Sequence, residues 1–196
     1  MIASSRSNLV IGYHGCDKQV AYQLLHNPYL VKKSKKPYDW LGHGFYVWEN
    51  KYERAFQWAK NKKKSGKIDI PFVLGVILTL GNCLDLLDSL YINYLSSFHS
   101  FYEDDTLLAG ETLPENKDVI GDEHKDTVVR ELDCSLIEYM HTRMAKDGLL
   151  GYDTVRGVFQ EGGPAFPGAG IKKKSHIQIC IRNMDSVKGF FYPKTK

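Results

Sequence analysis

The chain has 196 residues, of which 43% are hydrophobic and 25% charged, with a formal net charge of +3. This balance is typical of a globular protein, and we expect one domain over residues 1–196. The net charge is too small by itself to indicate a nucleic-acid-binding protein, although lysines cluster at 32–36, 60–64 and 172–174. Such clusters are usually solvated surface, but they also contact phosphate groups in nucleic-acid-binding proteins.

The four cysteines are widely separated in the sequence and form no Cys-x-x-Cys pair, so a zinc site is not indicated. Several of them lie in apolar runs, which fits buried free thiols in a reducing compartment. The first residues lack the apolar run of a signal peptide, and the longest apolar stretch, residues 72–81, is too short to span a bilayer. We therefore expect a cytoplasmic protein that does not interact with a membrane.

The chain begins with a predicted strand and helix. Residues 8–14 are apolar and β-branched and are followed by Gly15, which predicts a strand. Asp17 is a suitable N-cap for a helix that runs to about residue 26 with its apolar residues on one face.

A second strand and helix follow a glycine-rich turn. Residues 45–48 predict a short aromatic strand, and Asn50 is a suitable cap for the next helix. That helix is predicted by apolar residues at i, i+3, i+4 and i+7, namely Tyr52, Ala55, Phe56 and Ala59.

The rest of the chain alternates between the two kinds of element. The apolar run 72–80 predicts a buried central strand, and 86–102 and 127–146 predict helices, the second closed by Gly148. Residues 103–126 are polar and irregular, and a Gly/Pro loop at 161–170 lies among three predicted strands, 153–159, 175–182 and 187–192. Strands at both ends and helices between them indicate an α+β fold.

Several motifs are too incomplete to indicate a site. Gly42 and Gly44 lack the third glycine and the following helix of a dinucleotide-binding fingerprint. Glu138 and His141 have the spacing of half a carboxylate-bridged metal site, but no second copy exists. We expect no metal.

Three segments are informative together: "GYHG" at 12–15, "GHGFYVWEN" at 42–50 and "HIQICIRNMDSVKGFF" at 176–191. In order and spacing they resemble the ADP-ribosyltransferase superfamily, in the branch shared by diphtheria toxin and the poly(ADP-ribose) polymerases. The matching positions are His14-Gly15, Phe45-Tyr46 with Ala55, and Gln178. The resemblance spans nearly the whole chain and implies a split central β-sheet with flanking helices, with NAD+ as co-substrate.

A flat nicotinamide ring requires an aromatic platform and hydrogen bonds to its carboxamide. Gly15 has no side chain, so its N–H and C=O can approach the carboxamide, and His14 can donate to a ribose hydroxyl. Tyr46 is expected to stack on the ring, with Phe56 or Trp58 on the other side. The alternative for Tyr46 and His14 is a role in the core, with ligand binding favoured for both, whereas for Phe56 the core is favoured.

Cleavage of the nicotinamide–ribose bond develops positive charge on the sugar, which a carboxylate stabilises. The family most often has glutamate at the third position, whereas this chain has Gln178, which cannot act as a base. Single transfer or hydrolysis is therefore more plausible than chain formation. Glu161 is the best substitute carboxylate, either catalytic or simply a solvated loop residue, and Arg156 is a candidate for a cofactor phosphate, with His176 a weaker candidate.

The expected site therefore has catalytic residues Glu161, Gln178, His14 and Tyr46, and cofactor-binding residues His14, Gly15, Tyr46, Phe56, Trp58 and Arg156. The expected function is mono-ADP-ribosylation of a macromolecule, with nucleic acid slightly favoured over protein because lysines flank the site in sequence. Hydrolysis of NAD+ and a non-catalytic module that binds ADP-ribose or nucleic acid are the alternatives. The resemblance also implies a toxin or antiphage role with a neutralising antitoxin.

Overall fold

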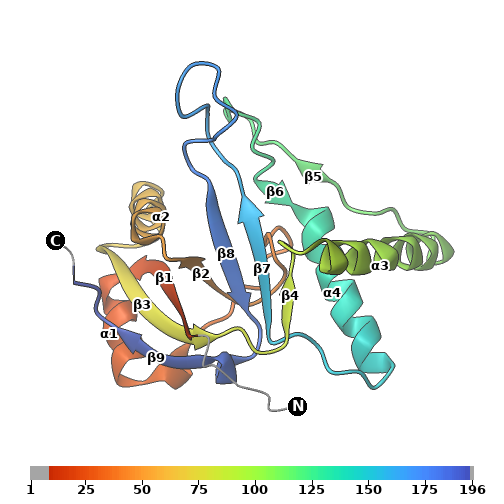
Figure 1. Ribbon diagram of the computed structural model, residues 1–196, viewed down its shortest axis with the longest axis horizontal. Coiled ribbons are helices and arrows are strands. Elements are labelled where there is room, and N and C mark those ends of the chain that lie inside the picture. Colours follow the sequence, from red (N-terminus) through yellow and green to blue (C-terminus); the bar gives the residue numbers. More distant parts are fainter. Residues whose placement is uncertain (1–8, 195–196) are drawn as a thin grey trace, which may run out of the picture.

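The computed structural model describes residues 9–194, which form a seven-stranded mixed sheet, four α-helices and a small two-stranded ribbon (Figure 1). The helices are α1 (Lys18–His26), α2 (Tyr52–Lys64), α3 (Ser89–Leu108) and α4 (Glu131–Lys146). The large sheet contains β1 (Leu9–Asp17), β2 (Phe45–Glu49), β3 (Pro71–Thr79), β4 (Cys83–Asp85), β7 (Thr154–Phe159), β8 (His176–Ile181) and β9 (Val187–Phe191). Strands β5 (Asn116–Lys117) and β6 (Val129–Arg130) form the ribbon.

The strand order is β4-β7-β8-β2-β1-β3-β9, and only the β4–β7 pair is parallel among these neighbours. The fold is therefore α+β. The two strands that carry the "HG" and "FY" segments, β1 and β2, are neighbours in the middle of the sheet, and β8 with Gln178 lies next to β2. Strand order thus brings the three segments that the resemblance used onto adjacent strands.

Helices cover both faces of the sheet. On one face, α1 packs Ala21 and Leu24 against Cys16 and Leu74. The other face has two separate apolar clusters. In one, α2 packs against Trp48 and Val73, and in the other, α4 packs against Val155 and Cys180. We call these the α1 face and the α2/α4 face. Helix α3 packs on α4 and extends away from the sheet (Figure 1).

The first helix confirms the capping prediction. The Asp17 side chain accepts a hydrogen bond from the Gln19 amide at 2.8 Å, as an N-cap does. Strand β1 continues to Asp17, three residues beyond the predicted end at His14, and the predicted first residue, Asn8, lies outside the described residues.

The Asn50 prediction is wrong. Asn50 has a φ of 50°, and α2 begins at Tyr52 with Lys51 as N-cap and no side-chain cap hydrogen bond. The Asn50 amide instead donates to the Ile11 carbonyl at 2.9 Å, so the residue continues the β1–β2 pairing before the chain turns into the helix.

Other helices and strands also differ from the predicted bounds or positions. Helix α3 begins at Ser89, where Asp88 caps it, and ends at Leu108, which takes in the first residues of the segment that was expected to be irregular. Helix α4 begins at Glu131, because residues 129–130 pair in the ribbon. Strand β3 lies second from the sheet edge rather than in the centre. In residues 9–194, no helix is both long and apolar enough to cross a membrane.

Candidate active site

The pairing of β1 with β2 stops at the "HG" segment. Tyr13 pairs with Trp48, and in a continuing antiparallel ladder the next hydrogen-bonded pair would be Gly15 with Tyr46. The Tyr46 carbonyl is instead 2.7 Å from Nδ1 of the His14 ring. The N–H and C=O of Gly15 face the β2 side of the strand but have no partner there in the described register of this ladder.

The hydrogen bond to Tyr46 fixes the protonation of His14. Burial lowers the pKa of His14 to about 4, so the ring is neutral at pH 7. Because its Nδ1 faces a carbonyl, Nδ1 carries the proton and Nε2 is the acceptor. His14 in this state can accept a hydrogen bond from a ribose hydroxyl but cannot donate one, which reverses the direction expected from the sequence.

Gly15 has a packing role as well. A Cβ atom at this position would fall well inside van der Waals contact of the Ala55 carbonyl oxygen, and it would also crowd the Ala59 amide. The absence of a side chain at Gly15 is thus required for α2 to lie against β1. Close approach by a ligand is a second reason at most.

The Tyr46 ring lies on the α2/α4 face, where it packs against the cluster that contains Leu41 and Cys180. Its hydroxyl donates to the Gly42 carbonyl at 2.6 Å and accepts from the Leu41 amide at 2.9 Å. Burial raises the pKa of this phenol, so it stays protonated. His14 packs against Phe45 on the α1 face, with ring centroids 4.4 Å apart. The two side chains therefore point to opposite faces of the sheet.

A polar cluster lies on the α2/α4 face at the start of β8, whereas Cys180 next to Tyr46 is near the end of this strand. Glu161 forms an ion pair with Arg54 of α2, with Oε2 and Nη2 2.6 Å apart. The same Oε2 is 3.5 Å from Nδ1 of His176, whose Nε2 is 3.0 Å from the amide nitrogen of Gln178. The structure thus brings Glu161 and Gln178 together, and it does so through His176, which the sequence had ranked below them.

The Gln178 amide is oriented by His176, which is itself held by a hydrogen bond to the main chain. His176 Nδ1 lies 2.6 Å from the Lys174 carbonyl, and burial lowers the pKa of His176 to about 4, so the neutral ring donates from Nδ1 and accepts at Nε2. The Gln178 NH2 group donates to that Nε2, and its carbonyl oxygen then points away from His176. This oxygen is an acceptor, suited to a hydroxyl group.

Glu161 is 8% exposed, and burial raises its pKa, while the charges of Arg54 and Lys174 lower it. Two buried donors nearby, Trp48 Nε1 and Arg54 Nε, have no hydrogen-bond partner among residues 9–194. Buried donors are nearly always paired in folded proteins. These two are therefore available to a ligand or to ordered water.

The base of the β7–β8 loop is held firmly, although the loop itself projects beyond the sheet (Figure 1). The Lys174 amide donates to the Glu161 carbonyl and the Lys173 amide to the Gly163 carbonyl, both at 3.0 Å. The Gly162 amide donates to Asp126 at 2.7 Å. These bonds fix Glu161 at the root of the loop.

The remaining predicted residues lie apart from this cluster. Arg156 is on the α1 face, where it binds two carboxylates, Glu49 at 2.7 Å and Asp85 at 2.9 Å. These ion pairs already use its guanidinium. Phe56 packs with Tyr13 and Tyr52 against the core, as favoured from the sequence.

Trp58 is 46% exposed and lies 6.0 Å from Trp48, centroid to centroid, beside the cluster. It lies one turn after Arg54 on α2, so the two side chains share one side of the helix. Trp58 is therefore placed to contact a ligand bound at the Trp48–Glu161 cluster.

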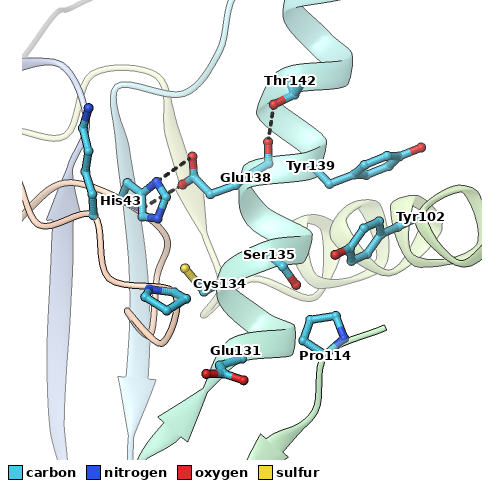
Figure 2. Close-up of a pocket in the computed structure, with 11 residues that line it drawn as sticks. His43, Tyr102, Pro114, Glu131, Cys134, Ser135, Glu138, Tyr139 and Thr142 are labelled. Atoms are coloured by element: carbon cyan, nitrogen blue, oxygen red, sulfur yellow. Dashed lines mark hydrogen bonds and ion pairs between the residues drawn. The ribbon is translucent and has the colours of Figure 1, made fainter. Parts of the chain in front are cut away.

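Two hollows on the surface of residues 9–194 bear on the site. One, of about 350 Å³, lies at the end of β2 and β8 and is lined by Glu49, Asn50, Lys51, Val158, Ser175, His176 and Ile177. Through His176 it reaches the polar cluster. The other, of about 580 Å³, lies along one side of α4, where Glu138 accepts a hydrogen bond from the His43 amide (Figure 2). Among the described residues, His14 and Tyr46 line neither of these two hollows.

Arg54 is the functional candidate that sequence reasoning missed. Its partner Glu161 is 107 positions away, so no local pattern could pair them. Its position one turn before Trp58, on the predicted helix, was the only available hint. Over residues 9–194, no group of three His, Cys, Asp or Glu side chains is arranged to hold a metal ion.

No protein-family model matches the chain, and neither a curated protein nor a solved structure gives a match.

Proposed function

We propose that this protein is an NAD+-dependent mono-ADP-ribosyltransferase with an ADP-ribosyltransferase-like split sheet. The observation that carries the proposal is the interruption of the β1–β2 ladder, where His14 replaces Gly15 as the partner of the Tyr46 carbonyl. It leaves one main-chain donor and one acceptor of Gly15 without a partner on β2 in this ladder, which matches the pair of groups that a carboxamide requires.

In the proposed reaction the bond between nicotinamide and ribose breaks, and its electron pair leaves with nicotinamide. The acceptor's nucleophile then forms the new bond to the sugar and loses a proton. Gln178 supplies a carbonyl oxygen for a ribose hydroxyl, and Glu161 supplies the negative charge opposite the developing positive charge. For this, Glu161 must exchange its Arg54 partner for the substrate.

The proposed acceptor is a macromolecule, with nucleic acid slightly favoured over protein. Helix α2, which carries Arg54 and Trp58, ends in Lys62, Lys63 and Lys64, and the β7–β8 loop carries lysines at 172–174. Basic side chains on both segments next to Glu161 would contact phosphates. Because such an activity damages its host, a toxin or antiphage role with a neutralising antitoxin belongs to the same proposal.

One feature favours a second candidate, a non-catalytic module that binds ADP-ribose or nucleic acid. Glu161 is occupied by Arg54 and the Gln178 amide by His176, so no free base is present in this arrangement. Hydrolysis of NAD+ would use the same residues as transfer, with water as the acceptor.

The test is nicotinamide release from NAD+, with and without RNA, DNA or lysate protein. We expect release by the wild type, and a loss of about 100-fold or more in Tyr46→Ala and in Glu161→Gln. Tyr29→Ala is the matched control, because Tyr29 is 94% exposed on a turn away from the cluster. Circular dichroism checks that each variant is folded.

The outcomes separate the candidates. Labelled ADP-ribose on RNA or DNA supports the favoured acceptor, and its steep loss with added salt would agree with phosphate contacts. Free ADP-ribose without any acceptor indicates hydrolysis. Binding of ADP-ribose without nicotinamide release, under all of these conditions, would reject the enzyme and leave the module.

A further inference from the structure

Helix α3 is apolar on two sides. One side packs against the rest of the protein through Tyr91, Leu95 and Phe98, and Tyr102 stacks on Tyr139 of α4 with ring centroids 4.8 Å apart. An apolar side of a helix is normally buried against another part of the protein or a partner. In this structure the second apolar side of α3 faces solvent.

The exposed side carries four large side chains, two at each end of a line that also contains polar residues. Leu90 is 68% exposed, Tyr94 37%, Phe101 54% and Leu108 87%. With the exposed polar residues Ser97 and Asp104, these positions follow each other at alternating steps of four and three residues. That spacing keeps side chains on the seam between two packed helices, as in a coiled coil. We call these six residues the α3 stripe.

The charges of α3 are unusual for an isolated helix. Glu103, Asp104 and Asp105 lie in its C-terminal half, close to the negative end of the helix dipole, and its last turn has no basic residue. A helix that packs antiparallel to α3 would place its positive N-terminal end near these carboxylates. The charge pattern therefore fits an antiparallel partner whose N-terminal half is free of acidic residues.

The N-terminal half of α3 itself meets this condition, since residues 89–98 contain no Asp or Glu and the one acidic residue at this end is the N-cap, Asp88. We propose that two copies of this chain associate through an antiparallel pairing of their α3 stripes about a two-fold axis. The symmetric register sets Leu90 against Leu108 of the second copy, Tyr94 against Asp104, and Ser97 against Phe101.

Each of these pairs is complementary. Two leucines bury apolar surface, the tyrosine hydroxyl donates to the aspartate, and the small Ser97 leaves room for the large Phe101 ring. Because a two-fold axis repeats every contact, the six residues of one stripe are all used. An unrelated partner would have no reason to match this internal pattern.

The first test is the mass in solution, measured by light scattering and by sedimentation at micromolar concentrations. We expect about twice the 22.4 kDa of one chain for the wild type and the mass of one chain for Leu90→Ser/Phe101→Ser/Leu108→Ser. Ile92→Ser is the matched control, because Ile92 is 48% exposed on the same helix but off the stripe, and it should remain dimeric. A wild type with the mass of one chain would overturn the proposal.

The second test fixes the direction of the pairing. Leu90 and Leu108 are about 27 Å apart along one helix, so cysteines at both positions cannot form a disulfide within one chain. Under oxidation, Leu90→Cys/Leu108→Cys should give a covalent dimer, whereas Leu90→Cys alone should give no more than the wild type does. Crosslinking by Leu90→Cys alone would indicate a parallel pair and reject this register. None of these outcomes depends on NAD+ activity.

Discussion

His14 and Tyr46 are joined by a hydrogen bond from the imidazole to the main-chain carbonyl, although their side chains point to opposite faces of the sheet. The ring thus takes the place that a Gly15 amide would occupy in an unbroken ladder. This relationship makes His14 a structural residue in its own right, whatever it does toward a ligand.

The packing of α2 on β1 predicts the effect of a side chain at Gly15. Gly15→Ala should lower the free energy of unfolding by about 3 kcal/mol, because the new methyl group meets the Ala55 main chain, which cannot move independently of the helix. Urea denaturation measures this. Gly189→Ala, in β9, is the matched control, since a Cβ there meets nothing within 4 Å and the cost should stay below about 1 kcal/mol.

The two neutral histidines predict a loss of stability in mild acid. In the unfolded chain His14 and His176 take up protons near pH 6.5, while in the folded protein their pKa is about 4. The unfolded state therefore binds more protons between these values, and each residue reduces stability by at most about 1.4 kcal/mol per pH unit as the pH falls from 6.5 to 4.

His14→Gln tests this dependence by urea denaturation at pH 7.5 and pH 5. The variant should be less stable at pH 7.5 but should lose less stability on acidification than the wild type. An equal loss in both proteins would contradict the assignment of a neutral His14.

The ion pair between Arg54 and Glu161 predicts strong coupling between the two residues. Arg54→Met should cost about 2–4 kcal/mol, because it leaves an unpaired carboxylate that is 8% exposed. Arg54→Met/Glu161→Gln should recover part of that loss, giving a coupling energy above about 1 kcal/mol in a double-mutant cycle. Additive losses would show that the pair contributes nothing beyond its separate members.

Gln178→Glu places a carboxylate opposite the acceptor nitrogen of His176. At pH 8 the two lone pairs repel each other, so the variant should be less stable than the wild type. Protonation of His176 relieves the repulsion, and the histidine pKa should rise by at least one unit from its present value of about 4. Nuclear magnetic resonance titration of the ring measures it, and an unchanged pKa would mean that the two groups do not face each other.

The regular elements followed from the sequence where periodicity was strong. The apolar spacing of Tyr52, Ala55, Phe56 and Ala59 predicted α2, and the Asp17 cap predicted the start of α1. Strand β4 was not predicted because three residues have no measurable periodicity, and Asn50 was misassigned because its role depends on a hydrogen bond to the neighbouring strand.

The candidate site was only partly predictable, because several of its contacts join segments that are far apart in the sequence. Glu161 and Gln178 were expected in one site from the family resemblance, and in the structure His176 links them. The opposite orientations of His14 and Tyr46 depend on the register of β1 against β2, which neither strand encodes alone. The use of Arg156 by Glu49 and Asp85 depends likewise on three separate segments meeting on one face.

The anchored base of the β7–β8 loop makes the position of Glu161 independent of the sequence of the loop tip. Residues 164–172 are closed by the bridge between Pro164 and Lys172, while Glu161 is fixed below it by its own main-chain bonds. The sequence and length of segment 164–172 can therefore change without displacing the Glu161 carboxylate. A loop tip from another protein, grafted onto this base, should change which molecules the loop contacts and leave the free energy of unfolding nearly unchanged.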